Sequence, residues 1–242
     1  MKVLIFGPTG MVGQGVLRES LLATDVSSVT AVGRSRLPLD VPKLRQLVQA
    51  DLMTLERRAT ELEGYDACFF CLGVSSSGMD EKQYSQITYG LTIHVAELLA
   101  RLNPQMTFVY VSGAGTDSSE KGKSMWARVK GRTENALQRL PFKGVYLFRP
   151  GVIEPLHGLR SKTPSYRYFY ALARPLLSLV RWIAPGVIVT TESVGKAMLN
   201  CSGPLTPDTF LGEDDRHTEV FHEQTTSFFH ARVQARGRRF GA

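Results

Sequence analysis

The sequence has few cysteines and no long apolar run. Three cysteines in 242 residues are too few for a disulfide framework, which excludes a small disulfide-stapled scaffold. No uninterrupted apolar stretch reaches the roughly 20 residues that a membrane-spanning helix needs. The apolar residues 1–6 meet Gly7-Pro8 at once, too early for a signal peptide. These absences favour a reducing compartment, and we expect a cytoplasmic protein.

Positive charge is only mildly in excess. The formal net charge is +7, and four arginines crowd the last residues of the chain, so the body without them carries +3. This weak excess argues against nucleic acid as a partner, but it suits an anionic cofactor. The four arginines are Arg232, Arg236, Arg238 and Arg239.

Glycine, by contrast, recurs at a regular spacing of three residues near the amino terminus. An apolar strand over residues 1–6 is followed by glycines at 7, 10 and 13 and by helical apolar spacing over 14–22. Strand, glycine turn and helix in this order predict a dinucleotide-binding turn. A plain strand–turn–helix without a ligand is the alternative. The predicted phosphate-binding residues are Gly7, Thr9, Gly10, Met11, Val12 and Gly13.

The next predicted strand, residues 26–32, ends in Gly33-Arg34-Ser35-Arg36. A carboxylate here would bind the ribose 2′-hydroxyl of NAD, and none is present. Arginine forks match a phosphate, so Arg34, Ser35 and Arg36 predict NADP, with NAD as a second choice. The alternative is that both arginines are solvated loop residues.

Two further strands end in residues that we expect near the cofactor. Residues 44–50 are followed by Asp51-Leu52, where Asp51 can accept from the adenine amine or cap a short helix that starts near Thr54. Residues 65–72 form a buried strand that ends at Gly73. Its Cys68-x-x-Cys71 pair is read as core packing and not as a redox or metal pair, and no metal site is predicted. Cys71, Leu72 and Gly73 are expected to line the cofactor.

Strands that alternate with helices predict an α/β fold with a doubly wound parallel sheet, that is, a Rossmann fold with a small carboxyl-terminal helical extension. The later elements are a helix from Asp80 to about Leu102, a strand over 106–111, a helix over 124–137, a strand over 145–148 and a capped helix over 190–199. We predict one domain over 1–199, with 152–199 on the substrate side, and an irregular tail over 200–242.

The segment 164–185 is rich in aromatic and apolar residues. Arg167, Arg174 and Arg181 recur every seven residues on one helix face, and Pro175 should kink or split the helix. A lid over the substrate site or a subunit contact is one interpretation. A basic amphipathic helix resting weakly on an anionic membrane is the other.

Taken together, several short motifs resemble the short-chain dehydrogenase/reductase superfamily in its atypical or extended branch. Most similar are the bacterial NAD-dependent epimerase/dehydratase-like proteins, which resemble the Tat-interacting-protein oxidoreductase group. The resemblance covers about residues 1–199 and rests on Gly7–Gly13, Ala50–Leu52, Cys71–Gly73, Tyr110–Gly115, Val129–Gly131 and Arg149–Gly151.

The resemblance implies roles for individual residues. Ser112 would orient a substrate oxygen, Lys130 would hold the nicotinamide ribose, and Pro150, Gly151 and Val152 would line the cofactor. The position of the family's acid/base tyrosine, four residues before the lysine, holds Trp126. An indole N–H does not titrate near neutral pH, so Trp126 cannot transfer the proton.

Three consequences of this substitution stay open. Another tyrosine takes over, with Tyr84 and Tyr89 as candidates and Tyr110 as a weaker one; or the substrate needs no tyrosine proton; or the chain binds NADP(H) without turnover. We therefore predict an oxidoreductase acting on a small hydrophobic carbonyl-type substrate, as a monomer or homodimer. A non-catalytic NADP(H) sensor or scaffold, peripheral to a membrane, is the alternative.

Overall fold

The computed structural model of this protein describes residues 1–158 and 188–203 and two short strands at 218–219 and 232–233. The strands are β1 (Lys2–Phe6), β2 (Ser28–Gly33), β3 (Leu44–Val48), β4 (Ala67–Phe70), β5 (Thr107–Val111), β6 (Gly144–Phe148), β7 (Val152–Glu154), β8 (Ile188–Thr190), β9 (Thr218–Glu219) and β10 (Arg232–Val233). The helices are α1 (Met11–Leu22), the 3₁₀ helix η1 (Leu52–Leu62), α2 (Glu81–Ser85), the π-helical turn η2 (Gln86–Gly90), α3 (Leu91–Leu102), α4 (Met125–Leu137) and α6 (Thr191–Asn200).

The main sheet has the strand order β3-β2-β1-β4-β5-β6-β10-β9. Neighbouring strands from β3 to β6 are parallel, and β10 and β9 continue the sheet beyond β6 in antiparallel pairs. The order of the parallel strands is that of a dinucleotide-binding doubly wound sheet. The predicted fold class is therefore confirmed. Ligands of such sheets bind at the carboxyl ends of the strands, where the order reverses between β1 and β4.

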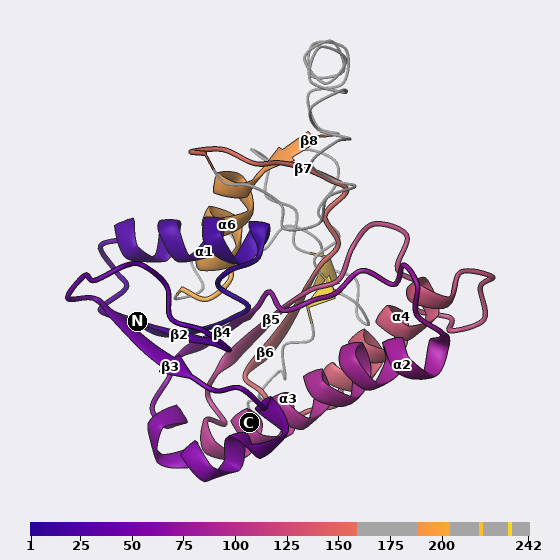
Figure 1. Cartoon of the computed structure of the whole chain (residues 1–242), viewed down its shortest axis with the longest axis horizontal. Coiled ribbons are helices and arrows are strands. Elements are labelled where there is room, and N and C mark those ends of the chain that lie inside the picture. The colour runs from indigo at the N-terminus through magenta and orange to yellow at the C-terminus, as the bar shows by residue number, and fades with distance from the viewer. Residues whose placement is uncertain (159–187, 204–217, 220–231, 234–242) are drawn as a thin grey trace, which may run out of the picture.

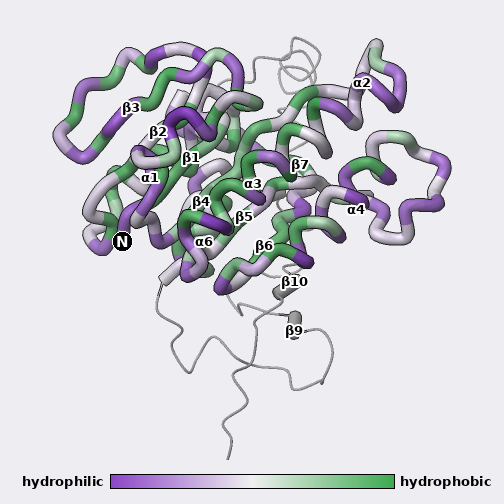
Figure 2. The backbone as a smooth tube through the Cα atoms, turned by 90° about the horizontal axis from the view of Figure 1, so that it is seen from below, coloured by the Kyte–Doolittle hydropathy of each residue, from purple (hydrophilic) through white to green (hydrophobic). Residues whose placement is uncertain are grey.

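Alternate residues of β1 face opposite helical layers, because successive side chains of a strand point to opposite faces. Val3 and Ile5 pack with residues of α1 and α6, whereas Leu4 and Phe6 pack with residues of η1, α3 and α4. Figure 1 shows α1 and α6 on one side of the sheet and α2, α3 and α4 on the other. Hydrophobic residues follow the central strands in Figure 2, and hydrophilic residues concentrate in peripheral loops. Burial on both faces explains the uninterrupted apolar run of β1.

The helical segment expected from Asp80 to Leu102 is continuous but not regular. Asp80 caps its start, and Gln83 completes a capping box. The π-helical turn η2 interrupts the segment, while the backbone at Ser85 and Gly90 stays right-handed helical. Helical periodicity does not reveal such a turn, because one wider turn leaves the apolar spacing on either side intact.

Residues after β6 dock back onto the first helix of the fold. β7 and β8 form a separate parallel pair that the sequence did not predict, and a capping box of Thr190 and Ser193 starts α6. A Cβ at Gly15 would lie 2.6 Å from the Thr191 carbonyl oxygen, so only glycine allows α1 and α6 to approach this closely. The segment 164–185, for which two roles were predicted, lies outside the described residues.

Candidate functional site

The glycine turn after β1 is tightly built. Gly7 has a φ of 74°, and a Cβ there would lie 2.8 Å from the backbone of Leu72 at the end of β4. A Cβ at Gly13 would lie 2.1 Å from the Gly7 carbonyl oxygen. At Gly10 the nearest atom would be 3.5 Å away, an ordinary contact. Gly7 and Gly13 therefore bring strand, turn and helix together, and Gly10 leaves the backbone open to a ligand.

The amino terminus of α1 is available to an anion. Gly10 is its N-cap, no side chain caps it, and its first turn holds no acidic residue. The first N–H groups of a helix lack intrahelical partners and carry a partial positive charge. A pyrophosphate supplies the acceptors and the negative charge that such a terminus lacks. The turn of Gly7, Thr9, Gly10, Met11, Val12 and Gly13 thus fits a dinucleotide.

The end of β2 lies beside this turn. A Cβ at Gly33 would lie 3.6 Å from Cγ of Pro8, which places the following Arg34 next to the turn. Arg34, Ser35 and Arg36 are exposed. Within the described part of the chain, no hydrogen bond or ion pair engages the side chain of Arg34 or Arg36. Both guanidinium groups are therefore available to a phosphate.

Asp51 takes the capping role that was one of its two predicted roles. Its carboxylate accepts a 2.9 Å hydrogen bond from the backbone N–H of Met53 and caps η1. The adenine contact stays a prediction. It is compatible with the cap, because a carboxylate has lone pairs enough to accept from both the Met53 N–H and an adenine amine. Leu52 is buried beneath it, with 5% of its surface exposed.

The segment after β4 runs along the glycine turn. The backbone of Cys71 and Leu72 approaches Gly7, and the backbone N–H of Cys71 donates to the Phe6 carbonyl oxygen at 3.0 Å. Cys68 and Cys71 are free thiols. Burial raises the pKa of Cys71 to about 12 and raises that of Cys68 as well. Neither thiol is activated as a redox or ligand thiolate would be.

Ser112, at the carboxyl end of β5, turns its hydroxyl into the protein. The hydroxyl donates to Oε1 of Glu134 at 2.5 Å, and only 6% of the residue is exposed. Glu134 is 1% exposed and lies on α4. A buried carboxylate needs such donors to offset its lost hydration. The substrate-orienting role of Ser112 stays a prediction, and its observed partner is a carboxylate of the protein.

Arg149, which follows β6, completes this buried network. Its Nε donates to both carboxylate oxygens of Glu134, at 3.0 and 3.1 Å, and a second nitrogen pairs with the same carboxylate. The guanidinium also donates to the hydroxyl of Ser118 in the loop before α4. One carboxylate therefore joins the ends of β5 and β6 to α4. Glu134 had no predicted role, although its position four residues after Lys130 places both on one helix face.

Lys130 also binds the end of β5. Its ammonium donates to the backbone carbonyl oxygen of Ser112, and the side chain is partly buried. Burial lowers the pKa of Lys130 to about 8, while the carboxylate of Glu134 acts in the opposite direction. An amine with this pKa exists in both protonation states near neutral pH.

Trp126 lies one helical turn before Lys130. Its ring approaches Gly115 in the loop after β5, 3.4 Å from where a Cβ would be. Of its suggested replacements, Tyr84 and Tyr110 are 2% and 1% exposed. Burial, together with the nearby Tyr84 and Glu134, raises the pKa of Tyr110 far above its ordinary value. Neither tyrosine can reach a substrate at the surface of the site.

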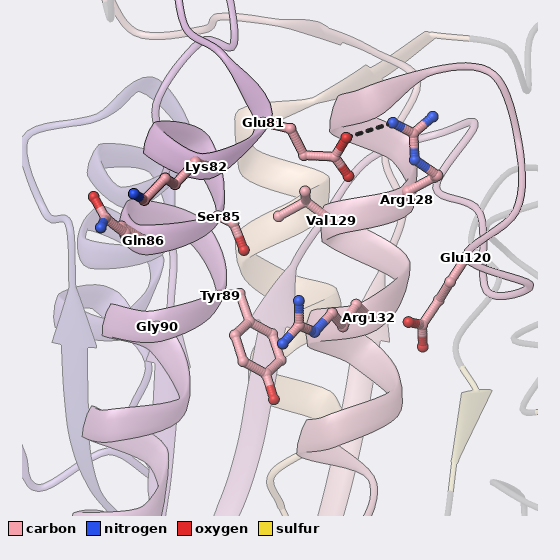
Figure 3. A pocket seen from close by; sticks show the side chains of 10 residues that line it. All are labelled: Glu81, Lys82, Ser85, Gln86, Tyr89, Gly90, Glu120, Arg128, Val129 and Arg132. Carbon is pink, nitrogen blue, oxygen red and sulfur yellow. Dashed lines mark hydrogen bonds and ion pairs between the residues drawn. The ribbon is translucent and has the colours of Figure 1, made fainter.

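Tyr89, the remaining candidate, lies in a groove of about 590 Å³ between η2 and α4 (Figure 3). Its ring stacks under the guanidinium of Arg132, 4.1 Å from the ring centroid. Arg128 lines the same groove and pairs with Glu81 at 2.6 Å. Arg128 and Arg132 occupy a different face of α4 from Lys130, given 3.6 residues per turn. Tyr89 therefore does not replace the missing tyrosine.

Pro150, Gly151 and Val152 link the main sheet to the β7–β8 pair. The backbone N–H of Ala114 donates to the Pro150 carbonyl oxygen at 2.9 Å, and Val152 pairs with Ile188. The loops after β5 and β6 thus meet at the carboxyl edge of the sheet. The structure gathers the predicted residues along this one edge, and their contacts with a cofactor stay predictions.

Comparison with known proteins places the chain in a family, although no family model matches it. Protein HTATIP2 of Rattus norvegicus is 29% identical over 202 residues, which cover 82% of this chain and 80% of that protein. Protein FMP52, mitochondrial, of Saccharomyces cerevisiae is 30% identical over 166 residues, 67% of this chain and 69% of its own. The chain belongs to the family of these two proteins. It is an atypical short-chain dehydrogenase/reductase related to the Tat-interacting-protein group, as the motifs predicted.

Solved structures show the same fold at lower identity. The Bordetella bronchiseptica enzyme WbmH, in complex with NAD⁺, superposes with a TM-score of 0.60 at 18% identity, over 83% of this chain and 72% of that one. A short-chain dehydrogenase/reductase family oxidoreductase from Burkholderia thailandensis also has a TM-score of 0.60, at 17% identity, over 84% and 85% of the two chains. At these identities the likeness concerns the fold alone.

The expected cytoplasmic location is contradicted by the names of this chain's relatives. The FMP52 proteins of Saccharomyces cerevisiae and Aspergillus terreus, among others, are named mitochondrial. The expectation rested on scarce cysteines and on the absence of a recognisable signal peptide or spanning segment; scarce cysteines indicate a reducing environment but do not distinguish one organelle from another. No helix of the described residues combines the length and apolarity needed to cross a membrane.

Proposed function

We propose that this member of the family is an oxidoreductase that binds NADP(H) and reduces a small hydrophobic carbonyl-type compound. The observation that carries the proposal is the combination of an uncapped α1 terminus with two exposed arginines beside the glycine turn, Arg34 and Arg36, whose side chains pair with none of the described residues. A 2′-phosphate would be bound by the arginine forks, and the pyrophosphate by the helix terminus.

Each group of residues has its own role in binding the dinucleotide. The backbone from Gly7 to Gly13 binds the pyrophosphate, and Lys130, which is held by the Ser112 carbonyl oxygen, donates to the nicotinamide ribose. Cys71 to Gly73 and Pro150 to Val152 flank the dinucleotide. When bound, the dinucleotide supplies the hydride for the reduction.

Calorimetric titration of the purified protein with NADPH and with NADH tests the cofactor preference. We expect NADPH to bind at least tenfold more tightly, and the Arg34→Asp substitution to abolish or reverse that preference. Arg139→Asp is a matched control, because Arg139 is also exposed but follows the far end of α4. Tighter binding of NADH to the unaltered protein would contradict the proposal.

A second function is favoured by one observation. Trp126 occupies the tyrosine position, and Tyr84 and Tyr110 are buried, which supports a non-catalytic NADP(H)-responsive sensor or scaffold. The two functions differ in turnover. Oxidation of NADPH, followed by absorbance with a panel of aldehydes, ketones and quinones, would support the enzyme, whereas tight binding without any oxidation would support the sensor.

A further inference from the structure

Among the described residues, none of the candidate tyrosines lies at the carboxyl edge of the main sheet with access to a substrate. A carbonyl reduced to an alcohol must gain a proton on oxygen, and Trp126 cannot supply one, because its indole N–H does not titrate near neutral pH. Tyr84 and Tyr110 are enclosed in the core. Tyr89 stacks with Arg132 in the groove on another face of α4 (Figure 3). The hydroxyl of Ser112 already donates to Glu134.

Lys130 lies at this edge, and its side chain keeps partial access to solvent. It comes one helical turn after Trp126 on the same face of α4, and its ammonium is fixed by the Ser112 carbonyl oxygen at the carboxyl end of β5. An ammonium has three N–H donors. The bond to Ser112 uses one of them, which leaves donors for a ribose and for a substrate oxygen.

We propose that Lys130 is the general acid of this protein and takes over the proton transfer that the absent tyrosine would perform. The proposal rests on the oxidoreductase function proposed above. It differs from the ribose-holding role in that the amine itself gains and loses the proton during each turnover.

The step balances without any further reactant. The carbonyl carbon would gain a hydride, which is one hydrogen with two electrons, from the bound dinucleotide, which would be oxidised. The carbon–oxygen double bond becomes a single bond as the oxygen takes a proton from the Lys130 ammonium. Lys130 is left as a neutral amine and regains its proton from water.

The surroundings of Lys130 suit this exchange. Burial holds its pKa at about 8, where both the acid and its conjugate base are populated, and proton transfer is most effective when the donor's pKa lies near the working pH. Glu134 is the carboxylate that faces Lys130 from its own helix, and Arg149, which follows β6, is paired with that carboxylate. Tyr110 on β5 and Tyr84 on α2 are further titratable groups of this region, and both are buried.

A labelling experiment tests the titration without relying on activity. The intact protein, with and without NADP⁺, is acetylated for a short time at pH values from 6 to 10, and the labelled peptides are quantified by mass spectrometry. We expect the reactivity of Lys130 to rise with a midpoint near pH 8, with the exposed Lys143 as internal reference. A Lys130 profile that coincides with that of Lys143 would overturn the proposal.

A kinetic experiment then links the titration to turnover. With saturating NADPH, kcat for carbonyl reduction should fall above about pH 8 as the ammonium is lost. Lys130→Arg keeps the charge and the donor to Ser112 but cannot release a proton near neutral pH. We expect it to bind NADPH within about threefold of the unaltered protein, and to lose ~100-fold or more of kcat. Lys143→Arg, the control, should change neither.

The outcomes separate this inference from the function on which it rests. A flat kcat profile to pH 10, or a Lys130→Arg variant that keeps most of its turnover, overturns the acid role and leaves the oxidoreductase standing. NADPH binding without turnover of any substrate overturns both.

Discussion

One half of the site is formed by backbone atoms and the other half by side chains. The glycine turn and the start of α1 form a binding surface of backbone atoms, in which glycines matter because they lack a Cβ. The edge formed by β5, α4 and the end of β6 is built from side chains, with Ser112, Glu134 and Arg149 in one buried network. A backbone surface binds the same group whatever the side chains are, whereas a network of side chains decides the chemistry residue by residue.

This difference explains how the chain keeps a complete phosphate-binding turn while Trp126 replaces the usual acid. Exchange of one side chain on α4 does not alter the N–H groups at the start of α1. Cofactor binding and chemistry are therefore separable in this protein, and substitutions in the two halves should have different consequences.

The largest effect on cofactor affinity is expected in the backbone half. Gly13→Ala places a Cβ 2.1 Å from the Gly7 carbonyl oxygen, which must displace the turn. We expect NADPH affinity to fall ~100-fold, about 2.7 kcal/mol, with a lower thermal midpoint. Gly90→Ala is the control: beyond its own helical turn, its Cβ would come no closer than 3.9 Å to another atom, so the variant should bind NADPH normally. Unchanged affinity in Gly13→Ala would contradict the assignment of this turn.

In the side-chain half, the expected effect is on stability alone. Arg149→Met leaves Glu134 buried without its ion-pair partner, which typically costs about 3–5 kcal/mol. Urea denaturation should show this loss. The double variant with Glu134→Met should recover much of it, because no unpaired charge remains. A double variant less stable than Arg149→Met would show that the pair is not the source of the loss.

The pH dependence of stability should report the lowered pKa of Lys130. Its folded pKa of about 8 lies below the value of 10.5 for an ordinary lysine, so from pH 8 to 10.5 the unfolded chain binds more protons than the folded one. The contribution of Lys130 to the free energy of unfolding therefore rises with pH across this window. Urea denaturation at several pH values should show the rise as the difference from Lys130→Met. A difference that stays constant would contradict the lowered pKa.

The smallest effect is expected at Trp126. The indole fills space against Gly115 and gives up no proton, so Trp126→Phe should leave NADPH affinity and kcat within about threefold, less than 0.7 kcal/mol. Titration and steady-state kinetics measure both. A hundredfold fall in kcat with unchanged affinity would show that the indole N–H takes part in the reaction.

The fold and the backbone half of the site were largely predictable. Apolar runs, the spacing of Gly7, Gly10 and Gly13 and the capping signals at Asp80 and Thr190 are local features, and the strand order follows the rules of parallel sheets. The β7–β8 pair and the π-helical turn η2 were not predicted. A three-residue strand carries almost no periodic signal, and a single wider turn leaves the apolar spacing intact on both sides.

The sequence by itself determined the dinucleotide-binding architecture, the arginines after β2 and the loss of the tyrosine at Trp126. Only the tertiary structure decided which polar groups are enclosed and which remain accessible. Ser112, Glu134 and Arg149 meet from three successive elements, 15 to 22 residues apart in the chain, and Tyr84 and Tyr110 are withdrawn from the site by the packing of α2 and β5. Burial and long-range pairing depend on the whole fold, so no local pattern of residues reports them.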